Sequence, residues 1–238
     1  LGLVGSEMCI RDSSDAGIIF IAYSILEIFS IITRYLIKLF YFPANGEISE
    51  ILLFWRIYVF SAVLLDIPVI IAILLMAYRS RSAGAVLKNG LIKYSFIPLI
   101  LFSMLRIFNS IYTIINIGLL LKAIEIKFYA PKSSLPVEIE NAIAFSFTID
   151  RAITLAAVSA FLMLGYGYYA ASLHDRTLRG VSFPSFLMIL SSFLLFFGFS
   201  VLMIDVSGIF LGKRLRDTAS RLLMRINENE TKSFIQSS

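Results

Sequence analysis

The chain has 238 residues, of which 58% are hydrophobic and 16% are charged, and its formal net charge is +5. Soluble domains contain about 25% charged and about 45–50% apolar residues, so this composition excludes a water-soluble globule and indicates a protein whose solvent is the lipid bilayer. The small positive excess, without a basic face interleaved with aromatic residues, suits anionic lipid headgroups and argues against nucleic acid as a partner.

The first thirteen residues are considered apart from the rest. Residues 3–12 read LVGSEMCIRD, which resembles a translated tagmentation adapter from DNA library preparation; the alternative is a native polar N-terminus. Segments of this kind are excluded from fold reasoning. We therefore expect residues 1–13 to be an artefact and the native chain to begin near Ser13 or Ser14, which leaves open whether a sixth helix preceded it. Cys9, the only cysteine, lies in this segment, so no disulfide or cysteine metal site is expected.

Five long apolar stretches follow, each long enough to cross the bilayer as a helix, which takes about 20 residues. Runs this long and continuous predict helices, because lipid admits only helices or closed barrels, and barrel strands alternate. The expected fold is all-α, a polytopic integral membrane bundle of five transmembrane helices within residues 14–212, with a basic amphipathic and polar tail at 213–238. The predicted spans are 18–42, 51–78, 94–121, a part of 139–171, and 184–211.

The first two spans carry charges in their interiors. Glu27 and Arg34 are seven residues apart and therefore share one helical face. Asp66 lies deep in the second span, two residues before Pro68, and a proline frees a backbone carbonyl one turn earlier. This pattern predicts either a cation or proton site at Asp66 or an ion pair with Arg106 or Arg34.

The third span has the most regular polar pattern. Ser103, Arg106, Asn109, Thr113 and Asn116 follow one another at steps of three or four, which keeps side chains on one helical face. An arginine at the membrane centre costs about 2.5–3.5 kcal/mol on insertion scales, so this face should point into the bundle. The stripe predicts either a hydrated path or a seam of interhelical hydrogen bonds, each contributing roughly 0.6–2 kcal/mol.

The fourth and fifth spans add Asp150, Arg151 and Asp205. Asp150 and Arg151 are neighbours and point about 100° apart on a helix, so each should engage a different helix or lie near the headgroups. Counting Arg56 in the second span, four acids face four bases, which predicts mutual neutralisation; an excess of one sign would indicate an ion pathway more sharply. The expected intramembrane polar network comprises Glu27, Arg34, Asp66, Arg106, Asn109, Thr113, Asn116, Asp150, Arg151 and Asp205.

Small and polar residues recur every seven positions in the fifth span, at Ser191, Gly198, Asp205 and Gly212. Small side chains at such positions let another helix approach closely. This pattern predicts a packing face for another helix of the chain, for a second copy in a homo-oligomer, or for a partner in a membrane complex.

Orientation follows from the positive-inside rule, which counts Lys and Arg near the ends of the spans. If all five spans cross, the second and fourth connections hold six such residues, and the opposite side, which includes the tail, holds nine. This count predicts a multi-pass protein of the cell membrane with a cytoplasmic C-terminus, although omission of the tail reverses the answer.

The usual signatures of enzymes are missing from the sequence. His174 is the only histidine, and GxSxG, Walker A and GxGxxG motifs do not occur. We therefore predict no catalytic, cofactor-binding or metal-ligating residues and no cofactor. The leading hypothesis is a transporter or permease component for a small solute or ion, with Glu27, Asp66, Arg106 and Asn109 lining its path. The alternatives are a structural or accessory subunit of a membrane complex and a lipid-modifying membrane enzyme.

Overall fold

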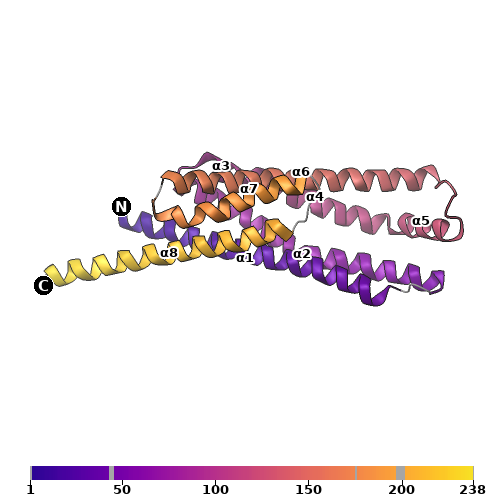
Figure 1. Ribbon diagram of the computed structural model, residues 1–238, viewed down its shortest axis with the longest axis horizontal. Coiled ribbons are helices and arrows are strands. Elements are labelled where there is room, and N and C mark those ends of the chain that lie inside the picture. Colours follow the sequence, from indigo (N-terminus) through magenta and orange to yellow (C-terminus); the bar gives the residue numbers. More distant parts are fainter. Residues whose placement is uncertain (1, 43–45, 175, 197–201, 238) are drawn as a thin grey trace.

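The computed structural model describes residues 2–42, 46–174, 176–196 and 202–237, and it describes only the backbone of residues 2–13, 86, 176, 196 and 222–237. Every element in these ranges is a helix (Figure 1). In chain order they are α1 (Gly2–Tyr41), α2 (Ile48–Val86), α3 (Gly90–Tyr94), α4 (Phe96–Ile115), α5 (Ile117–Tyr129), α6 (Val137–His174), the 3-10 helix η1 (Arg176–Val181), α7 (Ser182–Phe196) and α8 (Leu202–Ser237).

Five helical segments are long and apolar enough to cross a membrane, which confirms the all-α, multi-pass class. They are Ser14–Tyr41, Ile48–Ala85, Gly90–Ile115, Val137–His174 and Thr177–Leu195. The third predicted span, 94–121, is not one helix, because α4 ends at Ile115 and α5 begins at Ile117. Between them the Asn116 side chain donates to the Tyr112 carbonyl at 2.9 Å and satisfies an acceptor at the end of α4.

The fifth predicted span, 184–211, is wrong as a single helix. The chain reverses between α7 and α8: the Ser191 hydroxyl of α7 donates to the Met203 carbonyl of α8 at 3.1 Å, and Met188 lies beside Gly208. These pairings make α7 and α8 antiparallel (Figure 1). Continuous apolar character is the same for a helix that crosses the bilayer and for a hairpin that returns, so hydropathy alone could not separate the two. We call α7 and α8 together the hairpin.

Close backbone approach joins α8 to α1. A Cβ atom on Gly17 would lie 2.6 Å from the Gly212 carbonyl oxygen, and a Cβ on Gly212 would collide with the Gly17 carbonyl. Further along, a Cβ on Gly208 would collide with the Ser24 hydroxyl. Glycines at these positions let the two backbones pack at a distance that no larger residue allows. The contacts also show that α8 runs antiparallel to α1.

The α2–α3 connection, the N-terminal part of α1 and the outgoing part of α8 therefore gather at one end of the bundle, which we call the basic end. Asp15 of α1 pairs with Arg79 of α2 at 3.1 Å there. Both chain termini lie at this end in Figure 1, and α5 lies at the other. The Lys and Arg residues of the basic end whose side chains are described are Arg79, Arg81, Lys88, Lys93, Arg179, Lys213, Arg214, Arg216 and Arg221.

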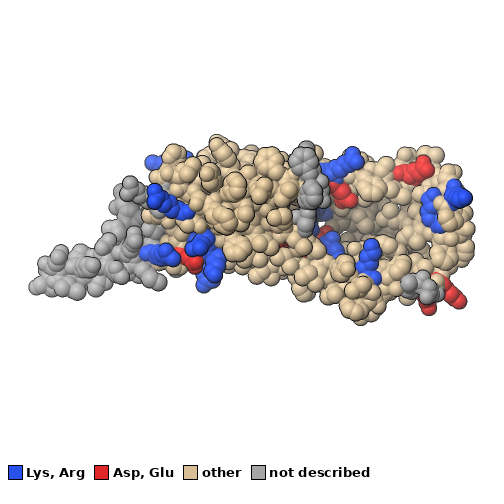
Figure 2. Space-filling view, in the orientation of Figure 1, with Lys and Arg blue, Asp and Glu red and all other residues tan. Residues whose placement is uncertain are grey.

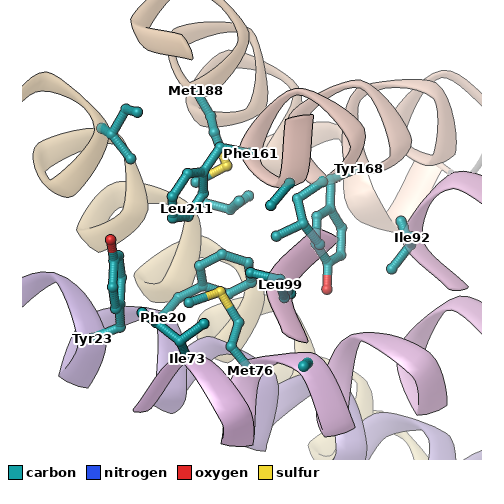
Figure 3. Close-up of a cluster of buried hydrophobic side chains, with 14 of the residues drawn as sticks. Phe20, Tyr23, Ile73, Met76, Ile92, Leu99, Phe161, Tyr168, Met188 and Leu211 are labelled. Atoms are coloured by element: carbon teal, nitrogen blue, oxygen red, sulfur yellow. The ribbon is translucent and has the colours of Figure 1, made fainter. Parts of the chain in front are cut away.

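The main apolar core lies in the half of the bundle nearer the basic end. Phe20, Met76, Leu99, Phe161 and Leu211 come from five different helices and are buried against one another (Figure 3). Beyond the C-terminal end of α7 and the start of α8, the described part of the bundle consists of α1, α2, α4, α5 and α6, and its surface is hollowed there (Figure 2). The half of the bundle that contains the hairpin is therefore packed, and the half without it is open.

Candidate functional site

Four charged residues from three helices form a continuous chain near the middle of the bundle. Arg106 of α4 donates through Nη1 to the Glu27 carboxylate of α1 at 3.0 and 3.2 Å, and through Nη2 to Asp66 Oδ1 of α2 at 2.9 Å. Arg34 of α1 donates to the same Asp66 oxygen. The planar guanidinium can serve two carboxylates because its donors are fixed in a fork. We call Glu27, Arg106, Asp66 and Arg34 the central ion-pair chain.

Burial falls along this chain from one end to the other. The Glu27 and Arg106 side chains are each 10% exposed, Asp66 is 16% exposed and Arg34 is 28% exposed. A charge removed from water is tolerated when it is paired and hydrogen-bonded. Pairing therefore explains how Arg106 can point into the bundle rather than toward lipid.

A cavity of about 190 Å³ lies beside the central ion-pair chain. One water occupies roughly 30 Å³ in the liquid, so the space can hold several waters or a small solute. Charged side chains of both signs are visible near the hollow in Figure 2. The polar lining consists of Tyr23, Glu27, Arg34, Asp66, Arg106, Asn109, Asp150 and Thr154, and the apolar lining of Phe102, Ile153, Ala157, Phe161, Leu195 and Ile204.

Asp150 adds a further carboxylate to the cavity. Asn109 of α4 donates to its Oδ1 at 3.2 Å, and the residue is exposed. Its neighbour Arg151 is also exposed but does not line the cavity. The angle between successive helical residues accounts for this difference.

The polar stripe of α4 divides into residues that bond across helices and residues that do not. Arg106 and Asn109 reach other helices, whereas Ser103 bonds to the Leu99 carbonyl and Asn116 to the Tyr112 carbonyl of the same helix. Neither Thr113 nor Asn116 lines the cavity. Only the middle of the stripe therefore belongs to the site.

The structure differs from the expected balance of four acids and four bases. Arg56 and Arg151 are exposed and lie outside the cavity lining, so Arg34 and Arg106 are the bases that the described residues bring to the centre. The acids there are Glu27, Asp66, Asp150 and Asp205. Carboxylates outnumber guanidiniums in the middle of the bundle.

Asp205 differs from the other central acids, because it has no hydrogen-bond partner among the described residues. It lies in the first turn of α8, is 0% exposed, and neither carboxylate oxygen has a hydrogen-bond partner among the described residues. It lies close enough to Tyr23, Glu27 and Arg106 to interact with them electrostatically, but it forms no hydrogen bond with them. Buried polar groups are normally hydrogen-bonded, so this carboxyl group needs a separate explanation.

Several residues of the site were missed by sequence reasoning. Phe102 stacks beneath the Arg106 guanidinium, 5.5 Å from ring centre to Cζ, which is a cation–π contact. Phe102 precedes Arg106 by four residues, so helical spacing could have identified it. Leu195 and Ile204 of the hairpin also line the cavity. No sequence signal could place them there, because a single helix over 184–211 does not bring these two residues together.

The predicted packing face of the fifth span is used inside the chain. Ser191 bonds to α8, Asp205 is fully buried, and Gly212 contacts α1, while Gly198 lies outside the described residues. Association with a second copy or a membrane partner stays a prediction, and these three residues are already covered within one chain.

Within the described part of the chain, no group of three or more His, Cys, Asp or Glu residues could hold a metal ion. Comparison with known proteins adds no identity: no family model, no curated protein and no solved structure matches this chain.

Proposed function

We propose that this protein is a membrane transport component that admits a small cation through its central cavity. The observation that carries the proposal is the cavity itself, because it lies at the middle of a membrane bundle and is lined by Glu27, Asp66 and Asp150 against Arg34 and Arg106. A surplus of carboxylates attracts cations and repels anions. Ionisable residues facing a cavity inside a membrane commonly mark ion and solute pathways.

Unsatisfied donors and acceptors support a hydrated site. Arg34 Nε and Asn109 Oδ1 are buried and have no hydrogen-bond partner in the described residues, and both side chains line the cavity. Water or a solute in the cavity would supply the missing partners. A purely structural seam would need no such space, since its hydrogen bonds would close on one another.

The orientation of the hairpin supports a cytoplasmic basic end. Because the chain reverses after α7, the basic residues of α8 share an end with those of the α2–α3 connection. The other end holds Lys122, Lys127 and Lys132 in its connection. The positive-inside rule then favours a cytoplasmic location for the basic end and for the C-terminus, whether or not the tail is counted. The hairpin fills the bundle between this end and the cavity, so the cavity faces the opposite side.

The transport proposal can be tested with purified protein in lipid vesicles. Uptake of protons, Na⁺, K⁺ and methylammonium is measured for the wild type, Asp150→Asn and the control Arg151→Gln. Asp150→Asn removes a cavity charge at an exposed position that tolerates the change, and we expect it to lower cation flux at least tenfold, a change of about 1.4 kcal/mol in barrier height. Arg151→Gln should leave flux unchanged. Folded wild-type protein that moves none of the four cations would contradict the proposal.

The orientation can be tested separately by cysteine labelling. Cys9 is replaced by serine, and single cysteines are placed at Lys88 in the basic end or at Ser134 in the α5–α6 connection. A membrane-impermeant maleimide applied to intact cells should label Ser134→Cys and spare Lys88→Cys until the cells are opened. The reverse pattern would show that the basic end is outside.

An accessory role is the second candidate, and one observation favours it. The central ion-pair chain joins α1, α2 and α4 through fully formed hydrogen bonds, as a stabilising seam would. If removal of Arg106 unfolds the protein while wild-type vesicles show no cation flux, this second reading is preferred.

A further inference from the structure

A second buried polar position lies just behind the cavity, where α8 packs on α1. Asp205 and Ser24 are both 0% exposed, and neither the carboxylate oxygens nor the Ser24 hydroxyl has a hydrogen-bond partner within the described residues. Gly208, one turn after Asp205, packs directly against the Ser24 hydroxyl. Both groups without a partner therefore lie on helices that pack closely together, one on α1 and one on α8.

Among the described residues, Arg106 is the one positive charge that interacts with Asp205, and it does not hydrogen-bond to it. The charged and titratable groups that interact with it are Tyr23 and Glu27 on α1 and Arg106 on α4. Arg106 is already bonded to Glu27 and Asp66. Helix α7, which also packs on α8, contains no titratable side chain. An ionised carboxylate here would be buried without a partner and close to a second acid, an arrangement that costs far more than a neutral acid would.

The surroundings of Asp205 favour a proton over a metal cation. Metal cations take several oxygen ligands at 2 Å or more, whereas the Asp205 carboxylate has no hydrogen-bond partner among the described residues and does not line the cavity. A proton needs no cavity, because it forms a covalent O–H bond with a carboxylate oxygen. The acid group created in this way can also donate a hydrogen bond, which an ionised carboxylate cannot.

We propose that Asp205 is a proton-binding site that is occupied in this conformation and exchanges its proton with the central cavity; this rests on the proposed transport function. Ile204, the residue before Asp205, lines the cavity, and successive residues on a helix point about 100° apart. The Asp205 side chain is therefore one helical position away from the cavity, and exchange takes place when a movement of α8 brings it there. There the O–H bond breaks, the proton passes to a cavity water, and the carboxylate remains.

The proton site should change how the stability of the fold depends on pH, and this effect does not depend on transport. A carboxyl group that is neutral when folded and ionised when unfolded binds more protons in the folded state, so it destabilises the fold as pH rises above about 4, where exposed aspartates ionise. Asp205→Asn keeps the neutral shape and removes this effect. The wild-type melting temperature, measured in detergent, should fall by about 3–5 °C per pH unit relative to Asp205→Asn between pH 5 and pH 7.

Asp217→Asn is the matched control, since Asp217 lies twelve residues later on the same helix and is partly exposed. It should follow the wild type at every pH. A melting temperature for Asp205→Asn that is below the wild type at pH 7 by the same margin as at pH 5 would overturn the proposal, because it would mean that Asp205 is ionised and stabilised.

Infrared spectroscopy keeps the proposal testable if Asp205→Asn does not fold. The wild type at pH 7 should show the carbonyl stretch of a protonated carboxyl, and Asp205→Glu should shift it; absence of such a band in the wild type would overturn the proposal. A melting temperature raised by NaCl over choline chloride in the wild type but not in Asp205→Asn would assign the site to Na⁺ instead, which also overturns it. Protein with the pH signature but no flux would keep the proton site and overturn transport.

Discussion

The half of the bundle at the basic end and the half beyond the hairpin tip are built from the same long helices but differ in what fills the space between them. In the first half, Phe20, Leu99 and Leu211 are buried to 1% exposure or less. In the second half, Arg34, Asp66 and Asp150 border a cavity. Long helices alone therefore do not determine whether a membrane bundle is solid or hollow.

The comparison shows what the hairpin contributes. Its residues complete the apolar core on one side, with Met188 and Leu211 both 0% exposed, and Leu195 of α7 and Ile204 of α8 line the cavity. Because α7 ends beside the residues of α6 near Ala157, the rest of α6 has no hairpin to pack on. The position of the reversal thus sets the position of the cavity.

The largest effect should come from breaking the central ion-pair chain. Arg106→Leu leaves Glu27 and Asp66 without their shared partner, and removal of one partner from a buried pair costs about 3–5 kcal/mol. We expect this loss of unfolding free energy in detergent, with Arg56→Leu as the control. Arg56 is exposed and lies outside the cavity lining, so its loss should be small. Equal unfolding free energies for Arg106→Leu and Arg56→Leu would contradict the role of Arg106 as the buried partner of Glu27 and Asp66.

A smaller effect should follow from separating α8 from α1 in the packed half. Gly212→Val places a side chain against the Gly17 carbonyl, and overpacking of this kind costs typically about 1–3 kcal/mol. The matched control is Gly118→Ala, since a Cβ at Gly118 meets nothing within 4 Å. That variant should keep or raise the melting temperature, because alanine favours helix by about 1 kcal/mol over glycine. A Gly212→Val protein as stable as the wild type would contradict the close α1–α8 contact.

The hydrogen bond at the open side of the cavity should contribute less. Asn109→Ala removes the bond to Asp150, and a typical intramolecular hydrogen bond contributes about 0.5–1.5 kcal/mol. Thr113→Ala, one turn further along the same face and outside the cavity lining, is the comparison. If the Thr113 variant loses as much unfolding free energy as the Asn109 variant, the polar stripe acts as one continuous seam.

Arg151→Gln should have the smallest effect on stability, within about 0.5 kcal/mol of the wild type, because exposed substitutions away from specific contacts rarely change more. The variant sharpens the comparison with Asp150, its neighbour on the same helix. A large loss of stability would mean that Arg151 has a structural partner in the membrane.

Much of the fold could be predicted from the sequence because the signal was long and local. Each of the first four spans shows itself as an apolar run, and Glu27 and Arg34 share a face because they are seven residues apart. The expected balance of four acids and four bases differs from the structure, because it counted charged residues without regard to the helical face on which each one lies. Arg56 precedes Asp66 by ten residues, which turns it about 80° away on the helix.

The reversal of the fifth segment could not be read from the sequence. It depends on contacts between distant residues, Gly208 with Ser24 and Gly212 with Gly17, and hydropathy does not report which helix a glycine meets. The cavity was out of reach for the same reason, since its boundary includes Leu195 and Ile204 from the hairpin. Local periodicity predicts which side chains share a helical face, but tertiary packing determines which residues of other helices lie opposite that face.

A single oxygen atom of Asp66 accepts hydrogen bonds from both Arg34 and Arg106. Any cation that binds this oxygen competes with two guanidiniums at once, one on α1 and one on α4. A ligand at this one atom would therefore weaken the hydrogen bonds that join α2 to α1 and to α4 together.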